Sequence, residues 1–183
     1  MGDLVKEGKI RYVGLSNETP WGLSEFIKAA EMHDLPKVVS VQNAYNLLNR
    51  IYESGMSEFH HRSQVGLLAY SPLAQGYLTG KYLDGARPAG ARTTLFERGQ
   101  RYETEQAEEI IRKYVNLANE NSMDPAFMAN SFVNDQDFVT SNIIGATTME
   151  QLKIAVGSID TKLDEECLKK IEEIHYGCPN PCP

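Results

Sequence analysis

The chain has 183 residues, of which 42% are hydrophobic and 23% are charged, as in a soluble globular protein. This length allows one domain with a sizeable core and is too short for two comfortable ones. The net charge of −7 argues against a nucleic-acid surface, and no apolar run approaches the roughly 20 residues that cross a bilayer.

Apolar runs typical of strands alternate with segments of helical spacing. In chain order, the sequence predicts a strand at 10–15, a helix at 23–32, a strand at 38–41, a helix at 50–63, a strand at 65–70, a helix at 105–120, a helix opening at 124–125, a strand at 138–144, and helices at 149–156 and 164–175. The strands are short and largely apolar, as expected where both faces of a sheet are covered. The alternation predicts an α/β fold with a parallel sheet, either doubly wound or part of a barrel.

Small or polar residues stand at the end of each predicted strand. They are Ser16-Asn17, Gln42-Asn43, Tyr70-Ser71 and Gly145-Ala146-Thr147. Any one set could serve only as a cap or a turn. Because the carboxyl ends of parallel strands share one edge, where α/β folds bind ligands, four such sets favour a ligand site there.

The segment 69–82, AYSPLAQGYLTGKY, leads from the third strand into a loop suited to an anion. Gly76 and Gly80 let the backbone approach a ligand, and Lys81 is a point charge suited to phosphate. An ordinary surface loop with a solvated lysine is the alternative. The dinucleotide motif G-x-G-x-x-G does not occur, and 76–81 misses the P-loop spacing by one residue, so neither a Rossmann nor a P-loop fold is supported.

The two ends of the sequence predict a cytoplasmic protein without metal or disulfides. The first 12 residues have no apolar core of a secretory signal, and Lys6 stands where a myristoylation site needs serine or threonine. The three cysteines, Cys167, Cys178 and Cys182, are odd in number and late in the chain, so a disulfide framework is not expected. No histidine stands at a matching spacing beyond them, which argues against a metal site.

Four motifs in this order resemble the aldo-keto reductases: GKIRYVGLSNET (8–19), SVQNAYNLLNR (40–50), AYSPLAQGYLTGKY (69–82) and IIGATTMEQL (143–152). The resemblance is closest to the Tas-type NADP(H)-dependent branch and covers essentially the whole chain. It implies a partial (β/α)8 TIM barrel in which the predicted strands resemble the fifth to the eighth. It also implies an oxidoreductase that reduces carbonyl compounds with NADPH.

The same resemblance implies an NADP(H) site at the strand ends. The implied residues are Ser16, Asn17 and Gln42 for the nicotinamide carboxamide, Tyr70 for stacking on the nicotinamide ring, Ser71, Leu73, Gln75 and Lys81 for the pyrophosphate, Arg92 for a further anion contact, and Gly145, Thr147 and Gln151 for the adenosine end. A carboxamide needs both donors and acceptors, which hydroxyl and amide side chains supply. The alternative for Tyr70 is a core tyrosine that caps the sheet.

The catalytic residues that the resemblance implies are missing. The family uses an aspartate, a tyrosine, a lysine and a histidine on the first four strands, with the aspartate five residues before the tyrosine, and no aspartate here has a tyrosine at that offset. We therefore expect residues 1–183 to form a single half-barrel, the C-terminal cofactor-binding half, without a catalytic residue and inactive alone. A small carbonyl substrate would bind only to a completed barrel.

Two further expectations follow from half a barrel. Its open sheet edges would favour a homodimer, because unpaired strand edges recruit partners. Two other functions stay open: a non-catalytic dinucleotide-binding or regulatory module, and a truncated remnant without function.

Overall fold

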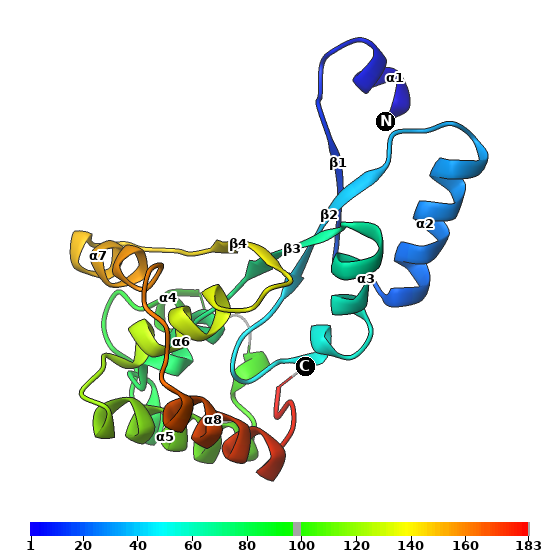
Figure 1. The fold of residues 1–183 in the computed structure, drawn as a ribbon. Helices are drawn as coiled ribbons and strands as arrows, with labels where there is room; N and C mark the ends of the chain where they lie inside the picture. The colour runs from blue at the N-terminus through cyan, green and yellow to red at the C-terminus, as the bar shows by residue number, and fades with distance from the viewer. Residues whose placement is uncertain (97–99, 183) are drawn as a thin grey trace.

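A four-stranded parallel sheet organises the chain, with its strands in the order β1-β2-β3-β4 (Figure 1). The structure is a computed structural model and describes residues 1–96 and 100–182. The strands are β1 (Val13–Ser16), β2 (Val38–Ala44), β3 (Gly66–Tyr70) and β4 (Val139–Ile143). The predicted α/β class is confirmed, and sequential parallel strands with flanking helices are the architecture of part of a (β/α)8 barrel.

Helices lie between and after the strands. The α-helices are α1 (Gly2–Lys6), α2 (Pro20–Met32), α3 (Met56–Ser63), α4 (Arg92–Phe96), α5 (Glu105–Glu120), α6 (Pro125–Asn134), α7 (Met149–Gly157) and α8 (Glu165–Gly177), and the 3-10 turns are η1 (Ile51–Glu53), η2 (Ala74–Thr79), η3 (Leu83–Gly85) and η4 (Gln100–Tyr102). Helix α6 begins as its sequence predicts, because the Asp124 carboxylate accepts from the Ala126 and Phe127 amides and proline takes the first helical position. Among the described residues, no helix is long and apolar enough to cross a lipid bilayer.

The predicted helix at 50–63 is wrong as a single element. It is divided into the short turn η1 and helix α3, and Gly55 between them has a φ of 99°. Right-handed helices require negative φ, so the chain changes direction there. The second strand is also longer than predicted and ends at Ala44, because its pairing with β3 continues to the Ala44 and Tyr70 positions. Gln42 and Asn43 therefore lie within β2 and do not follow it.

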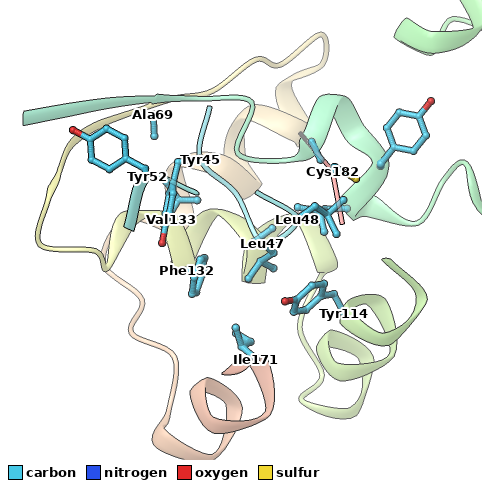
Figure 2. Close-up of a cluster of buried hydrophobic side chains, with 14 of the residues drawn as sticks. Tyr45, Leu47, Leu48, Tyr52, Ala69, Tyr114, Phe132, Val133, Ile171 and Cys182 are labelled. Carbon is cyan, nitrogen blue, oxygen red and sulfur yellow. The ribbon is translucent and has the colours of Figure 1, made fainter. Parts of the chain in front are cut away.

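One face of the sheet is buried against the helices. Helices α2, α3 and α6 pack against β2, β3 and β4, respectively. Val41 and Leu67 are paired positions that point into this core, where Tyr45 stacks on Phe132 with 6.0 Å between ring centroids. Figure 2 shows Tyr45 and Phe132 among the buried side chains that join this region to Ile171 of α8.

The opposite face of the sheet is open, which corrects the expectation that both faces are covered. Ser16, Gln42 and Ser141 lie in one row across the strands, with Leu68 between Gln42 and Ser141, and all three polar side chains are exposed. Within residues 1–96 and 100–182, β1 pairs only with β2 and β4 only with β3. The sheet thus has two open edges.

Candidate ligand-binding site at the strand ends

Hydrogen bonds bring the ends of β1, β2 and β3 together. Ser16 pairs with Gln42 across the sheet, and the Asn17 amide donates to the Gln42 carbonyl oxygen at 2.9 Å. The Tyr70 hydroxyl donates to Asn17 Oδ1 at 2.7 Å, so the tyrosine side chain links the end of β3 to the end of β1. The structure therefore gathers Ser16, Asn17, Gln42 and Tyr70 at the carboxyl ends of the strands, where the sequence predicts a ligand site.

The Asn43 side chain fixes the turn that follows β1. Asn17 has a φ of 54°, in the left-handed region that asparagine tolerates better than most residues. The Asn43 side chain holds this turn on both sides, since its Nδ2 donates to the Glu18 carbonyl at 2.9 Å and its Oδ1 accepts from the Glu18 amide at 3.1 Å. The sequence shows Asn43 at a strand end, but its positioning role becomes visible only in the fold.

The loop after β3 is a series of tight turns with unusual backbone conformations. Positive φ angles occur at Ser71, Ala74, Gln75, Gly76 and Gly80. The Ala74 amide donates to the Ser71 carbonyl at 2.8 Å, and the Gly76 amide donates to the Leu73 carbonyl at 2.8 Å. Left-handed conformations at non-glycine residues each cost on the order of 1–2 kcal/mol and cluster at ligand sites.

Lys81 folds back over this loop. A Cβ atom on Gly76 would lie 2.9 Å from both Cε and Nζ of Lys81, so the lysine passes directly over the glycine. Its Nζ also lies 5.1 Å from the centroid of the Tyr82 ring. Within the described part of the chain no carboxylate pairs with Lys81, which leaves its charge available to an anion.

Asn46 is the buried support of the loop, and the sequence prediction missed it. Its side chain is 0% exposed, and its Nδ2 donates to the Ser71 carbonyl at 3.0 Å and to the Tyr102 hydroxyl at 3.3 Å. Its Oδ1 accepts from the Leu48 and Asn49 amides. The NAYN sequence at 43–46 gives only a weak signal, because the partners of Asn46 lie 25 and 56 residues away.

The turn η4 brings a further cation to this edge. Tyr102 is 1% exposed, and burial raises its pKa. The neighbouring Arg101 is exposed, and a side-chain hydrogen bond with Tyr70 raises the pKa of its guanidinium. Arg101 was not among the predicted site residues, because nothing in its local sequence indicates that η4 lies beside Tyr70.

Arg92 lies at the start of α4, which is attached to the loop through its second residue. The Thr93 amide donates to the Tyr82 hydroxyl at 3.4 Å, and Tyr82 directly follows Lys81. Arg92 itself is exposed. No hydrogen bond or ion pair of Arg92 is found among the described residues, so the structure places it in the neighbourhood without joining it to the other predicted residues.

Gly145, Thr147 and Gln151 lie beyond the end of β4 and are exposed. Gln151 Oε1 accepts from the Thr147 amide at 2.8 Å and from the Thr147 hydroxyl at 3.1 Å, while the Thr148 hydroxyl caps α7 by accepting from the Gln151 amide at 3.2 Å. In the part of the chain that the structure describes, no neighbouring atom comes within 4 Å of a Cβ built on Gly145. The region after β4 is therefore open, but Gln151 Oε1 already accepts two hydrogen bonds from Thr147.

A cavity of about 180 Å³ lies behind the loop, outside the predicted set. Tyr77 and Arg87 both donate to the Glu103 carboxylate on its wall, Arg87 at 2.8 Å. Burial, followed by the hydrogen bond to Glu103, raises the pKa of Tyr77 to about 12. In residues 1–96 and 100–182, no three His, Cys, Asp or Glu side chains gather as a metal site.

Comparisons with known proteins agree with the motifs. The model of the aldo/keto reductase family matches residues 1–175. Protein tas of Escherichia coli (strain K12) is 48% identical over 183 residues, which cover 100% of this chain and 53% of that protein. An aldo-keto reductase of Babesia bovis is 38% identical over 97% of this chain and 65% of its own length.

A third relative, the L-glyceraldehyde 3-phosphate reductase of Escherichia coli (strain K12), is 34% identical over 85% of this chain and 46% of its own length. The chain spans about half the length of most of these curated relatives. The similarity extends over all four strands and the loops that follow them.

Proposed function

The chain belongs to the aldo/keto reductase family, and on that premise we propose that it is the cofactor-binding part of an NADP(H)-dependent oxidoreductase that reduces carbonyl compounds. One observation carries the proposal: Asn17 and Tyr70 are hydrogen-bonded at the same strand ends from which the loop of Lys81 departs. Exposed polar side chains and a lysine without a carboxylate partner among the described residues, together at the carboxyl ends of parallel strands, suit a dinucleotide.

The residues present fit a nicotinamide dinucleotide. When bound, the nicotinamide would supply a hydride to the carbonyl carbon. Asn17 Oδ1 already accepts from Tyr70, so its Nδ2 donor is left for a carboxamide oxygen, and the exposed Gln42 and Ser16 side chains offer further donors and acceptors. The hydrogen bond from the Tyr70 hydroxyl to Asn17 Oδ1 holds the ring in place, which preorganises a stacking surface.

Lys81 and the turns over 71–76 would hold the pyrophosphate. The glycine at position 76 lets the ammonium group lie against the backbone, where a side chain would displace it. Gly145, Thr147 and Gln151, all three exposed, would then meet the adenosine end. Arg92 would add an anion contact from α4.

We further propose that residues 1–183 act as one half-barrel domain, with no catalytic residue of their own and without turnover as an isolated chain. The open β1 and β4 edges support a homodimer in which these edges are covered. A cytoplasmic location is part of the same proposal. A non-catalytic dinucleotide-binding module is the second candidate, because no aspartate in this chain has a tyrosine five residues later.

Replacing Tyr70 or Lys81 by alanine tests the site. We expect each substitution to weaken NADPH binding about 10-fold, because base stacking on an aromatic ring and a charge-assisted hydrogen bond are each worth about 1.5 kcal/mol or more. The measurement is a titration of the 183-residue protein followed by nicotinamide fluorescence. The control is Lys113→Ala on the exposed surface of α5, where Glu109 is the one ion-pair partner of the lysine among the described residues. Unchanged affinity in both site variants would show that the cofactor lies elsewhere.

Comparing Gly76→Ala with Gly90→Ala separates the effect of backbone strain from the effect of displacing Lys81. Gly76 and Gly90 both have positive φ, 97° and 78°, but of the two only Gly76 has a described neighbour within 4 Å of an added Cβ. We expect alanine at either position to lower the free energy of unfolding by about 1 kcal/mol. Only Gly76→Ala should also weaken NADPH binding, by several-fold, because the flexible end of Lys81 has to move away. Equal NADPH affinity in the two variants would contradict the role of this contact.

A further inference from the structure

Two hydrogen bonds from Asn43 hold the backbone of Glu18, the residue that follows Asn17. Asn43 Oδ1 accepts from the Glu18 amide at 3.1 Å, and Asn43 Nδ2 donates to the Glu18 carbonyl at 2.9 Å. Because both polar groups of the Glu18 backbone are bound, a rotation of the chain at this residue breaks at least one of the two bonds. A side chain of β2 therefore sets the position of the turn after β1.

Asn17 depends on this support because of its backbone conformation. Its φ of 54° lies in the left-handed region, which a residue other than glycine keeps only where its surroundings hold it there. The Asn17 amide donates to the Gln42 carbonyl at 2.9 Å, and its side chain accepts from the Tyr70 hydroxyl at 2.7 Å. Asn43 holds the chain on the other side, at Glu18. The direction of the Asn17 side chain thus depends on contacts both at Asn17 and just after it.

The Asn43 side chain lies away from the proposed cofactor surface. Successive side chains of a strand point to opposite faces of a sheet, and the exposed Gln42 side chain lies on the open face. Asn43 is half-buried and lies on the face that the helices cover. Its influence on a ligand at the open face passes through the turn that it holds.

We propose that Asn43 is a positioning residue for the nicotinamide end of the cofactor. Through the Glu18 backbone it keeps Asn17 in the conformation that presents the Asn17 Nδ2 donor to the carboxamide. This inference rests on the proposed function. Loss of Asn43 is expected to lower the contribution of the nicotinamide to binding and to spare the rest of the dinucleotide, which the loop of Lys81 would hold.

Calorimetric titration of the 183-residue protein with two ligands tests this role. The ligands are NADPH and phospho-ADP-ribose, the part of NADPH that remains without the nicotinamide, and the wild type should bind NADPH more tightly. We expect Asn43→Ala to reduce this preference about 10-fold, as for the loss of one oriented hydrogen bond, with an unchanged affinity for phospho-ADP-ribose. Asn43→Asp, which loses the donor to the Glu18 carbonyl, should reduce the preference as well. A merely structural role would weaken both ligands equally.

Asn142→Ala is the matched control. Asn43 and Asn142 pair with the same residue, Ala69, from the two neighbouring strands. The Asn142 side chain donates to Oδ1 of Asn130 at 3.2 Å and of Asn134 at 2.9 Å, so its two bonds join β4 to α6 and not to the turn after β1. Its replacement should lower stability and leave the preference for NADPH as in the wild type.

Hydrogen exchange of the protein without ligand gives a second readout. Asn43→Ala should accelerate exchange of the Glu18 amide about 10-fold and leave the Leu67 amide, which donates to the Phe138 carbonyl, as in the wild type. An unchanged NADPH preference or an unchanged Glu18 exchange rate in Asn43→Ala would refute the role of Asn43 alone. Failure of the wild type to bind NADPH would instead refute the proposed function and this role with it.

Discussion

Arg50→Ala is expected to lower the free energy of unfolding by about 3 kcal/mol. The Arg50 side chain is 8% exposed and binds Glu53 through two bonds, Nε to Oε1 at 2.7 Å and Nη2 to Oε2 at 2.9 Å. Its Nη1 donates to Glu172 Oε1 at 2.7 Å, which joins the turn after β2 to helix α8. Removing the guanidinium leaves two carboxylates beside each other without a counter-charge.

The size of this loss follows from burial. Breaking a buried ion pair costs about 3–5 kcal/mol, and we expect the lower end because the Glu172 side chain is 38% exposed. The substitution also removes the guanidinium that lies 5.2 Å from the centroid of the Phe132 ring. Tyr45 loses support as well, because its hydroxyl donates to the same Glu53 carboxylate.

Urea unfolding of Arg50→Ala and Arg62→Ala measures the effect. Within residues 1–96 and 100–182, Arg62 pairs with Glu58 alone, on the exposed side of α3, so its removal is expected to change stability by less than about 1 kcal/mol. Comparable losses in the two variants would mean that the network around Arg50 contributes no more than a surface pair. A changed slope of the urea dependence would instead indicate an altered denatured or native state.

Asn46→Ala is expected to cost about 2 kcal/mol of stability and to weaken NADPH binding about 10-fold, although Asn46 is buried and does not reach the ligand surface. The Leu48 amide loses the acceptor Asn46 Oδ1, and the Ser71 carbonyl loses one of its two donors. The hydrogen-bonded link through Asn46 between the Ser71 carbonyl and the Tyr102 hydroxyl is then lost. The loss of affinity comes from this lost preorganisation.

The control for Asn46→Ala is Asn116→Ala on the exposed surface of α5. Alanine favours the helix there, so stability should stay the same or rise slightly, and NADPH binding should not change. Both quantities are measured on the same protein samples, by urea unfolding and by fluorescence titration. If Asn46→Ala lowered stability but bound NADPH as the wild type does, the loop would not depend on this support.

Local sequence predicts those parts of the fold and site whose partners lie close along the chain. The alternation of apolar runs and helical segments predicts the parallel sheet, and Lys81 and Gly76 are only five positions apart. The single helix predicted at 50–63 fails because one glycine with positive φ interrupts an otherwise helical spacing. The second strand extends past its apolar run because pairing with β3 decides its end.

Long-range contacts define the rest of the site. Asn46 meets Ser71 and Tyr102, which lie on different loops, and no periodicity in the sequence relates these positions. Arg101 follows a long connection between β3 and α5, so its place beside Tyr70 depends on the fold of that whole connection. The sequence also does not reveal that one face of the sheet is open, since Ser16, Gln42 and Ser141 form a row only once the strands are in register.

NMR mapping of NADPH binding to the 183-residue protein tests the central claim most directly. Added NADPH is predicted to shift the side-chain amide resonances of Asn17 and Gln42 and the backbone resonances of residues 71–81 and 145–151. These segments should respond together, with one dissociation constant. Absence of binding, or shifts confined to the surface between α5 and α8, would contradict a dinucleotide site at the strand ends.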